Sequence, residues 1–150
     1  METEMPLSVF RSLCQVLNAE TDMVEICTKG GHTAQFRGHY MTNVTTFSGF
    51  PIKQVPSDVK LDKTETSTSD EWEKQVMFAS YFLPKFVVHP FPSSTIVKIR
   101  FMHNQPIEFR YDIGGAFSYF GFFLAPRLNS DDSDEELSTK NKTKKRKVKD

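Results

Sequence analysis

The chain has 150 residues, 38% of them hydrophobic, and its 19 basic side chains balance its 19 acidic ones. This length fits one domain rather than two. The hydrophobic content, which includes 14 phenylalanines, excludes wholesale disorder and the collagen-like, coiled-coil and mucin-like classes. A net charge of zero argues against a nucleic-acid partner only if the charge is evenly spread, because duplex binding depends on neutralising phosphates.

The N-terminal residues contain no basic segment followed by an apolar run, so we expect no secretory signal. No apolar run approaches the roughly 20 residues of a membrane span, and we expect no membrane partner. Cys14 and Cys27 form no CxxC pair and have no pair of histidines nearby. This usage predicts reduced, buried thiols of an intracellular protein.

The first half of the chain predicts one helix followed by strands. After Pro6, apolar residues repeat with the spacing of one helical face, at Phe10, Leu13, Cys14 and Leu17. Three strands are expected next, at 23–28, 33–37 and 43–48, with a Gly-Gly turn between the first two. The polar segment 57–74 is rich in Ser, Thr and acidic residues, and it predicts a surface loop or a weak edge hairpin.

The second half predicts a short helix and three more strands. Residues 75–89 begin like a strand and become helical, with Ala79, Phe82, Leu83 and Phe86 on one side. An interior proline costs a helix about 3 kcal/mol, so this helix either begins near Pro84 or is kinked there. Strands are expected at 97–101, 107–111 and 117–124. The order predicts an α+β fold of two helix-plus-strands units, with both helices on one face of an antiparallel sheet.

A change of composition divides the chain into a domain, residues 1–129, and a tail, residues 130–150. The tail has no aromatic residue, and its six acidic and seven basic residues form an acidic block followed by a basic block. Such blocks repel themselves and predict disorder. Ser133 is followed by three acidic residues and predicts phosphorylation by an acidophilic kinase.

The basic block predicts a nuclear localisation signal that an import receptor reads, and therefore residence in the nucleus. Its densest part comprises Lys144, Lys145, Arg146 and Lys147. The alternative is a solvated basic tail that adheres to polyanions without directing import.

Several strings in the domain resemble, in order, the C-terminal half of the eukaryotic DNA sliding clamps, the proliferating cell nuclear antigen family. They are Met5-Pro6 with the apolar helix positions, MFA at 77–79, SSTIV at 93–97, QPIEFRY at 105–111 and FFLAPRL at 122–128. The last string, which follows the PIEFRY strand, is the most specific. The match runs from about Met5 to Leu128, and residues 30–74 are only weakly similar.

The resemblance implies one sliding-clamp domain, with helices lining the inside of a ring and sheets outside. In that family each chain has two such domains, three chains close a ring around duplex DNA, and the ring tethers replication and repair proteins as a processivity factor. Partners dock short peptides on the outer face. The resemblance assigns this docking to Pro106, Phe123, Leu124, Ala125, Pro126, Arg127 and Leu128. It assigns ring closure to an edge strand, Asn43, Val44, Thr45, Thr46, Phe47 and Ser48.

The chain also departs from the family pattern. The N-terminal half has no counterpart here, so peptide docking is expected to be weaker or to need a partner chain. Positions where the family carries bases on the ring-facing helices are Ser12, Gln15 and Val88, which leaves Arg11 and Lys85 as candidates to face DNA. Weak, non-specific phosphate contact is therefore expected. Pro84 could distort the inner surface itself.

Two functions follow from this sequence. The first is a clamp-like processivity factor or clamp subunit, forming a homo-oligomer or a hetero-oligomer with a clamp, that serves as a scaffold for replication and repair. The second is a nuclear interaction module, or truncated clamp paralogue, that docks peptides without encircling DNA; a fragment of a longer protein would look the same.

An enzyme is the poorest fit to the sequence, and we expect no catalytic residue, metal or cofactor. The four histidines are scattered, and no GxSxG, HExxH, phosphate-loop or dinucleotide fingerprint occurs. Asp70, Glu71 and Glu73 cluster in a polar segment, where a solvated surface is the simpler interpretation than a metal site.

Overall fold

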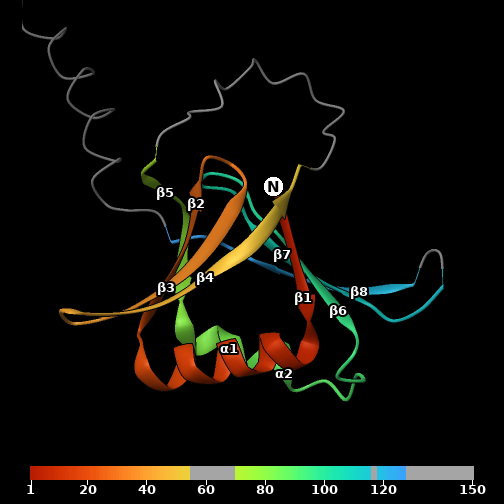
Figure 1. Cartoon of the computed structure of the whole chain (residues 1–150). Coiled ribbons are helices and arrows are strands. Elements are labelled where there is room, and N and C mark those ends of the chain that lie inside the picture. Colours follow the sequence, from red (N-terminus) through yellow and green to blue (C-terminus); the bar gives the residue numbers. More distant parts are fainter. Residues whose placement is uncertain (55–69, 116–117, 128–150) are drawn as a thin grey trace, which may run out of the picture.

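The computed structural model describes residues 1–54, 70–115 and 118–127. One antiparallel sheet of eight strands, in the order β5-β2-β3-β4-β1-β6-β7-β8, curls above two helices (Figure 1). Its elements are β1 (Glu2–Pro6), α1 (Leu7–Glu20), β2 (Met23–Lys29), β3 (Thr33–Tyr40), β4 (Asn43–Lys53), β5 (Trp72–Ala79), the 3₁₀ turn η1 (Ser80–Phe82), α2 (Leu83–Val87), β6 (Ile96–Arg100), β7 (Ile107–Asp112) and β8 (Tyr119–Leu124). The tail, with Ser133 and the basic run at 144–147, lies outside the described residues.

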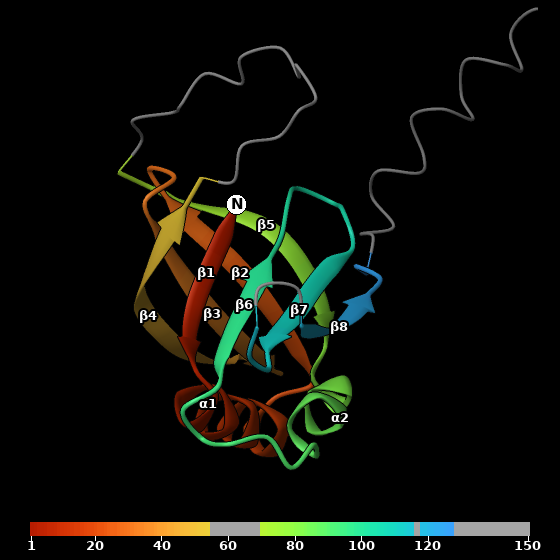
Figure 2. The ribbon, with the colours of Figure 1, turned by 90° about the vertical axis from the view of Figure 1, so that its right-hand side faces the viewer.

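The described chain consists of two units with the same order, a strand, a helix and three strands. The first is β1-α1-β2-β3-β4 and the second is β5-α2-β6-β7-β8. The first strand of each unit pairs with the other unit, because β1 pairs with β6 and β5 pairs with β2. The units therefore interlock in one sheet, and both helices lie side by side on one face of it (Figure 2). This arrangement confirms the α+β architecture predicted from the sequence.

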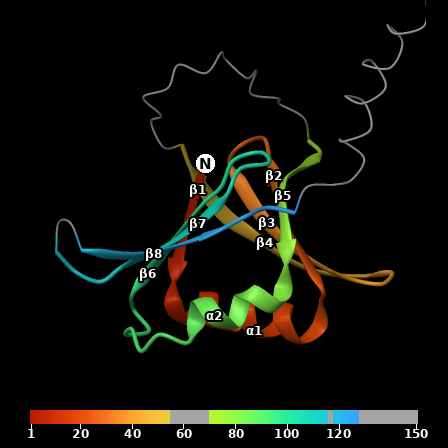
Figure 3. The same cartoon turned by 180° about the vertical axis from the view of Figure 1, so that it is seen from behind.

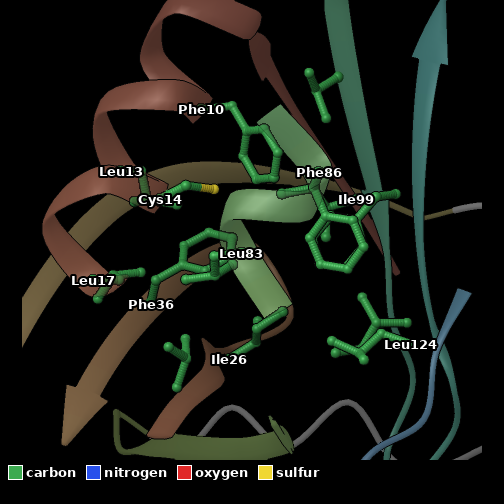
Figure 4. Packing of buried hydrophobic residues seen from close by; sticks show 14 of the residues in the cluster. Phe10, Leu13, Cys14, Leu17, Ile26, Phe36, Leu83, Phe86, Ile99 and Leu124 are labelled. Carbon is green, nitrogen blue, oxygen red and sulfur yellow. The ribbon is translucent and has the colours of Figure 1, made fainter. Parts of the chain in front are cut away.

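Helix α1 forms where the sequence predicts it, and its apolar face enters the core (Figure 4). The buried residues of α1 are Leu7, Phe10, Leu13, Cys14 and Leu17. Pro6 occupies the N-cap position and supplies no side-chain cap. The first free amide groups of the helix are satisfied elsewhere, because Leu7 N–H donates to Thr95 C=O at 2.7 Å and Ser8 N–H donates to Ser93 C=O at 3.2 Å.

The second helix is shorter than the apolar pattern suggested. Helix α2 has five residues, and Pro84 lies in its first turn, where a missing amide hydrogen removes no helical bond. The helix therefore begins at Leu83, directly before the proline, and is not kinked by it. Ala79, which the pattern placed on the helix, ends strand β5 instead.

Three strand predictions need correction. Strand β1, a strand of only five residues between β4 and β6, was missed because it gives no clear alternation. Strand β4 continues five residues beyond the predicted end, through Gly49 at a φ of 91°. Residues 72–74, expected in a polar surface segment, belong to β5, because pairing with β2 overrides their polar composition.

Both cysteines are buried free thiols, as their spacing predicted. Burial raises the pKa of the Cys14 thiol well above its ordinary value, and burial is also the main reason that the pKa of Cys27 rises to about 11. Neither thiol is therefore a ready nucleophile at neutral pH.

Over the described ranges, none of the helices has the length and apolar character needed to cross a bilayer.

Candidate functional site

Strand β8 carries the centre of the docking segment that the resemblance implies. Phe123 lies opposite Glu108 of β7, and Leu124 lies opposite Ile107. Since side chains alternate along a strand, Leu124 enters the core at 7% exposure while Phe123 points outward at 74% exposure. Phe123 is thus an aromatic side chain offered to solvent, and among the exposed aromatic residues of the described chain it has the largest exposed fraction.

The outward face around Phe123 otherwise carries paired charges. Arg100 of β6 makes ion pairs with Glu2 and with Glu108, the latter at 3.4 Å, and hydrogen bonding to Glu2 raises the pKa of Arg100. Toward the other end of β8, where Asp112 lies opposite Tyr119, Lys98 pairs with Asp112 at 2.6 Å. These neighbours neutralise one another, so the surface beside Phe123 offers little net charge to a ligand.

Another outward aromatic side chain of β8 is already engaged. Tyr119 lies at the far end of the strand, and the guanidinium carbon of Arg110 sits 3.7 Å from the centre of its ring. Tyr119 is 49% exposed, against 74% for Phe123. Phe123 is therefore the more available anchor of the two.

Residues 125–127 hold the end of β8 against strand β5. Arg127 N–H donates to Met77 C=O at 2.7 Å, and the Arg127 guanidinium reaches Met23 Sδ at 3.4 Å. Ala125 is exposed and Pro126 is half-buried. Leu128, the last residue of the predicted docking segment, lies outside the described residues.

Pro106 lies in the turn between β6 and β7, and this turn is also bound to β5. Asn104, at a φ of 53°, donates its N–H to Gln75 C=O at 3.1 Å. Gln75 and Met77 are two residues apart on one strand, a separation of roughly 7 Å. The structure therefore brings the turn that contains Pro106 and the 125–127 segment to the same edge of β5, although they are about 20 residues apart in the sequence.

The two basic residues expected to face DNA differ in their exposure and in their contacts with the rest of the protein. Lys85 is exposed on α2, with its ammonium 5.4 Å from the centre of the Phe82 ring. Arg11 on α1 is half-buried, and its guanidinium donates to the carbonyls of His89 and Phe91 at 3.0 and 3.2 Å. Among the described residues, Lys85 is thus the more accessible of these two cations.

The helical layer is otherwise almost uncharged. Ser12 and Gln15 are exposed polar residues of α1, and Val88 is an exposed apolar residue after α2. These are the positions where the resembled family carries bases. The layer gives little electrostatic attraction for phosphates, since the attraction depends on the number of cations.

The predicted subunit edge, Asn43–Ser48, forms the outer part of β4. Strand β4 pairs with β3 along most of its length, but on its other side β1 pairs only with Ile52 and Lys53. Within the described ranges, the side of β4 facing away from β3 is unpaired over 43–50. The hairpin of β3 and β4 extends to one side of the molecule, and the hairpin of β7 and β8 extends to the other (Figure 3).

The described residues contain no group of three or more His, Cys, Asp or Glu placed to hold a metal ion. His39 pairs with Glu25 at 3.0 Å, and His89 packs among aromatic rings. The packing of His89 and Phe91 against β8 was not found from the sequence. The sequence feature that could have indicated this packing is the concentration of aromatic residues near 89–91 and 119–123.

Comparison with known proteins supports the fold. No protein-family model and no curated protein sequence matches the chain. A chain in the solved structure described as "C-terminal region of FEN-1 bound to A. fulgidus PCNA" matches with a TM-score of 0.59 and 17% identity, over 86% of this chain and 47% of that chain. This protein therefore spans about half the length of the matched chain. At this identity the likeness is one of fold, and the curled sheet with two helices is compatible with a clamp-like domain.

Proposed function

We propose that this protein is a sliding-clamp-like scaffold for DNA replication and repair proteins, which dock short peptides on the surface formed by Phe123, Pro106 and residues 125–127. The exposed Phe123 carries the proposal. An exposed aromatic anchor of this kind suits a peptide with apolar side chains on a helical turn. The likeness of the fold to a chain of a clamp complex supports it.

Titration of a labelled clamp-binding peptide tests this docking. Phe123→Ser is expected to lower the affinity about tenfold or more, the loss typical of a truncated aromatic anchor. Pro126→Ser is expected to weaken binding as well. Tyr119→Ser is the matched control, since it removes an outward aromatic residue from the same strand, and it should retain the wild-type affinity.

Equal affinity of the wild-type and Phe123→Ser proteins would remove the docking surface from the proposal. The circular dichroism spectrum and unfolding midpoint of each variant show whether the fold is retained. Because Phe123 is mostly exposed, its replacement should leave both nearly unchanged.

A second candidate is a nuclear interaction module that docks peptides but does not encircle DNA. The engagement of Arg11 and the uncharged helical layer favour it, since few cations remain for phosphate contact. The two candidates differ in assembly. A clamp must close a ring, as a homo-oligomer or with another clamp, and contact duplex DNA weakly and without sequence preference, whereas a docking module functions as a monomer.

We further propose that the protein works in the nucleus and that the run Lys144, Lys145, Arg146 and Lys147 binds an import receptor. Phosphorylation of Ser133 would add charge to the acidic block beside this run. A fluorescent fusion that ends at Leu128 is expected to lose nuclear enrichment, measured by microscopy against the full chain. An unchanged distribution would exclude the tail as the import signal.

A further inference from the structure

The segment that joins α2 to β6, residues 88–95, lies between the start of α1 and strand β8. Arg11 fixes it on one side. The guanidinium donates from Nη2 to His89 C=O at 3.0 Å and to Phe91 C=O at 3.2 Å, and Nη1 approaches Ser93 Oγ at 3.5 Å. Within the described residues, no other group donates a hydrogen bond to either of these two carbonyls.

On its other side the same segment packs against β8. The ring of His89 lies 5.2 Å from the rings of both Phe120 and Phe122, nearly parallel to the latter. Phe91 lies 5.9 Å from Phe120 and 5.6 Å from Tyr111. Ring pairs at these separations add to the stability that burial alone provides.

The contacts with His89 and Phe91 act on strand β8 together with its pairing to β7. Strand β8 is the last strand of the sheet, and among the described strands it pairs only with β7. Its inner face is held by aromatic packing, of which His89 and Phe91 supply three of the contacts. Phe122 on that inner face directly precedes Phe123 on the outer face, so a shift of one moves the other.

We propose that Arg11 is a positioning residue for strand β8. By holding the His89 and Phe91 carbonyls, it keeps their rings against β8 and so fixes the place of Phe123. This inference rests on the proposed peptide docking for its functional consequence. It also means that the guanidinium of Arg11 cannot contact a phosphate fully while it holds both carbonyls.

The test compares three variants by hydrogen exchange and by titration of a labelled clamp-binding peptide. Arg11→Gln removes the charged donor and is expected to speed amide exchange about tenfold in 88–95 and β8, since a hydrogen bond from a charged group is lost. Peptide affinity should fall severalfold. Arg11→Lys cannot reproduce the planar fork and should give intermediate values. Lys85→Gln, which removes the same charge from the same layer, should match the wild type.

The exchange pattern decides the inference by itself. Unchanged exchange of β8 in Arg11→Gln would overturn it, and so would faster exchange throughout the sheet, including β2 and β3, which would assign Arg11 a general structural role. If the wild-type protein binds no peptide, the docking proposal fails, while exchange confined to 88–95 and β8 still supports the positioning role. Faster local exchange with unchanged peptide affinity would overturn the link from Arg11 to Phe123.

Discussion

Gly38 shows how a single residue sets the distance between α1 and the sheet. It is buried in β3, and a Cβ atom built on it would lie 2.3 Å from Thr21 Cγ2 and 2.8 Å from Leu17 Cδ2. Both neighbours belong to the end of α1 or follow it directly, and Leu17 is fully buried. There is no space for a methyl group, so only glycine lets the helix approach the strand this closely.

Gly38→Ala is therefore expected to destabilise the protein by about 1–3 kcal/mol, the cost of inserting a methyl group into a packed core. The measurement is the free energy of unfolding in denaturant. Gly121→Ala is the matched control, because it is also a strand glycine and its added Cβ would lie at an ordinary 3.5 Å from the Tyr119 ring. A Gly38→Ala protein as stable as this control would show that the helix can move away at no cost.

At the level of elements, the sequence pattern correctly predicted the helix and the hairpin whose apolar residues recur at regular short spacings. The apolar positions of α1 recur every three or four residues, and all four that the pattern selected are buried. The hairpin of β6 and β7 was predicted by strict alternation. The length of helix α2 was overestimated. The apolar residues that precede it belong to strand β5 and to the 3₁₀ turn η1, and the spacing of side chains in these elements differs from that of an α-helix.

The candidate site could be predicted only in part, because its geometry depends on contacts between distant residues. The run at 122–124 is apolar throughout, so alternation alone does not tell that Phe123 points outward and Leu124 inward. Arg11 was placed correctly on the polar side of α1, but its carbonyl partners are 78 and 80 residues away. No spacing rule reports such a contact, and Arg11 was named as a candidate to face DNA only through the resemblance to the clamp family.

At the level of the whole molecule, the last strands of the two interlocked units, β4 and β8, resemble each other in how they meet the other unit. Strand β4 joins the next unit only at its last residues, through Ile52 and Lys53. The segment after β8 likewise meets β5 through the bond of Arg127 to Met77. The outer parts of both strands extend from the body on opposite sides (Figure 3). Neither β8 nor the outer part of β4 carries a charged residue that would prevent edge pairing.

An edge without charged residues on β4 predicts association through that strand, and Thr46→Pro tests it. The loop between β3 and β4 has two residues. Tyr40 and Asn43 are therefore the hydrogen-bonded pair that closes this hairpin. Bonding then alternates along the ladder, so the N–H of Thr46 points away from β3. Replacing it with proline removes an edge donor without removing a β3–β4 bond, and Thr46→Ala is the control.

Light scattering at micromolar concentration should show an assembly for wild type and Thr46→Ala, and a smaller species for Thr46→Pro. If the wild-type chain stays monomeric both alone and with a full-length clamp, β4 is not a subunit edge, and the docking module becomes the better description of this protein. If Thr46→Pro assembles as the wild type does, association uses another surface.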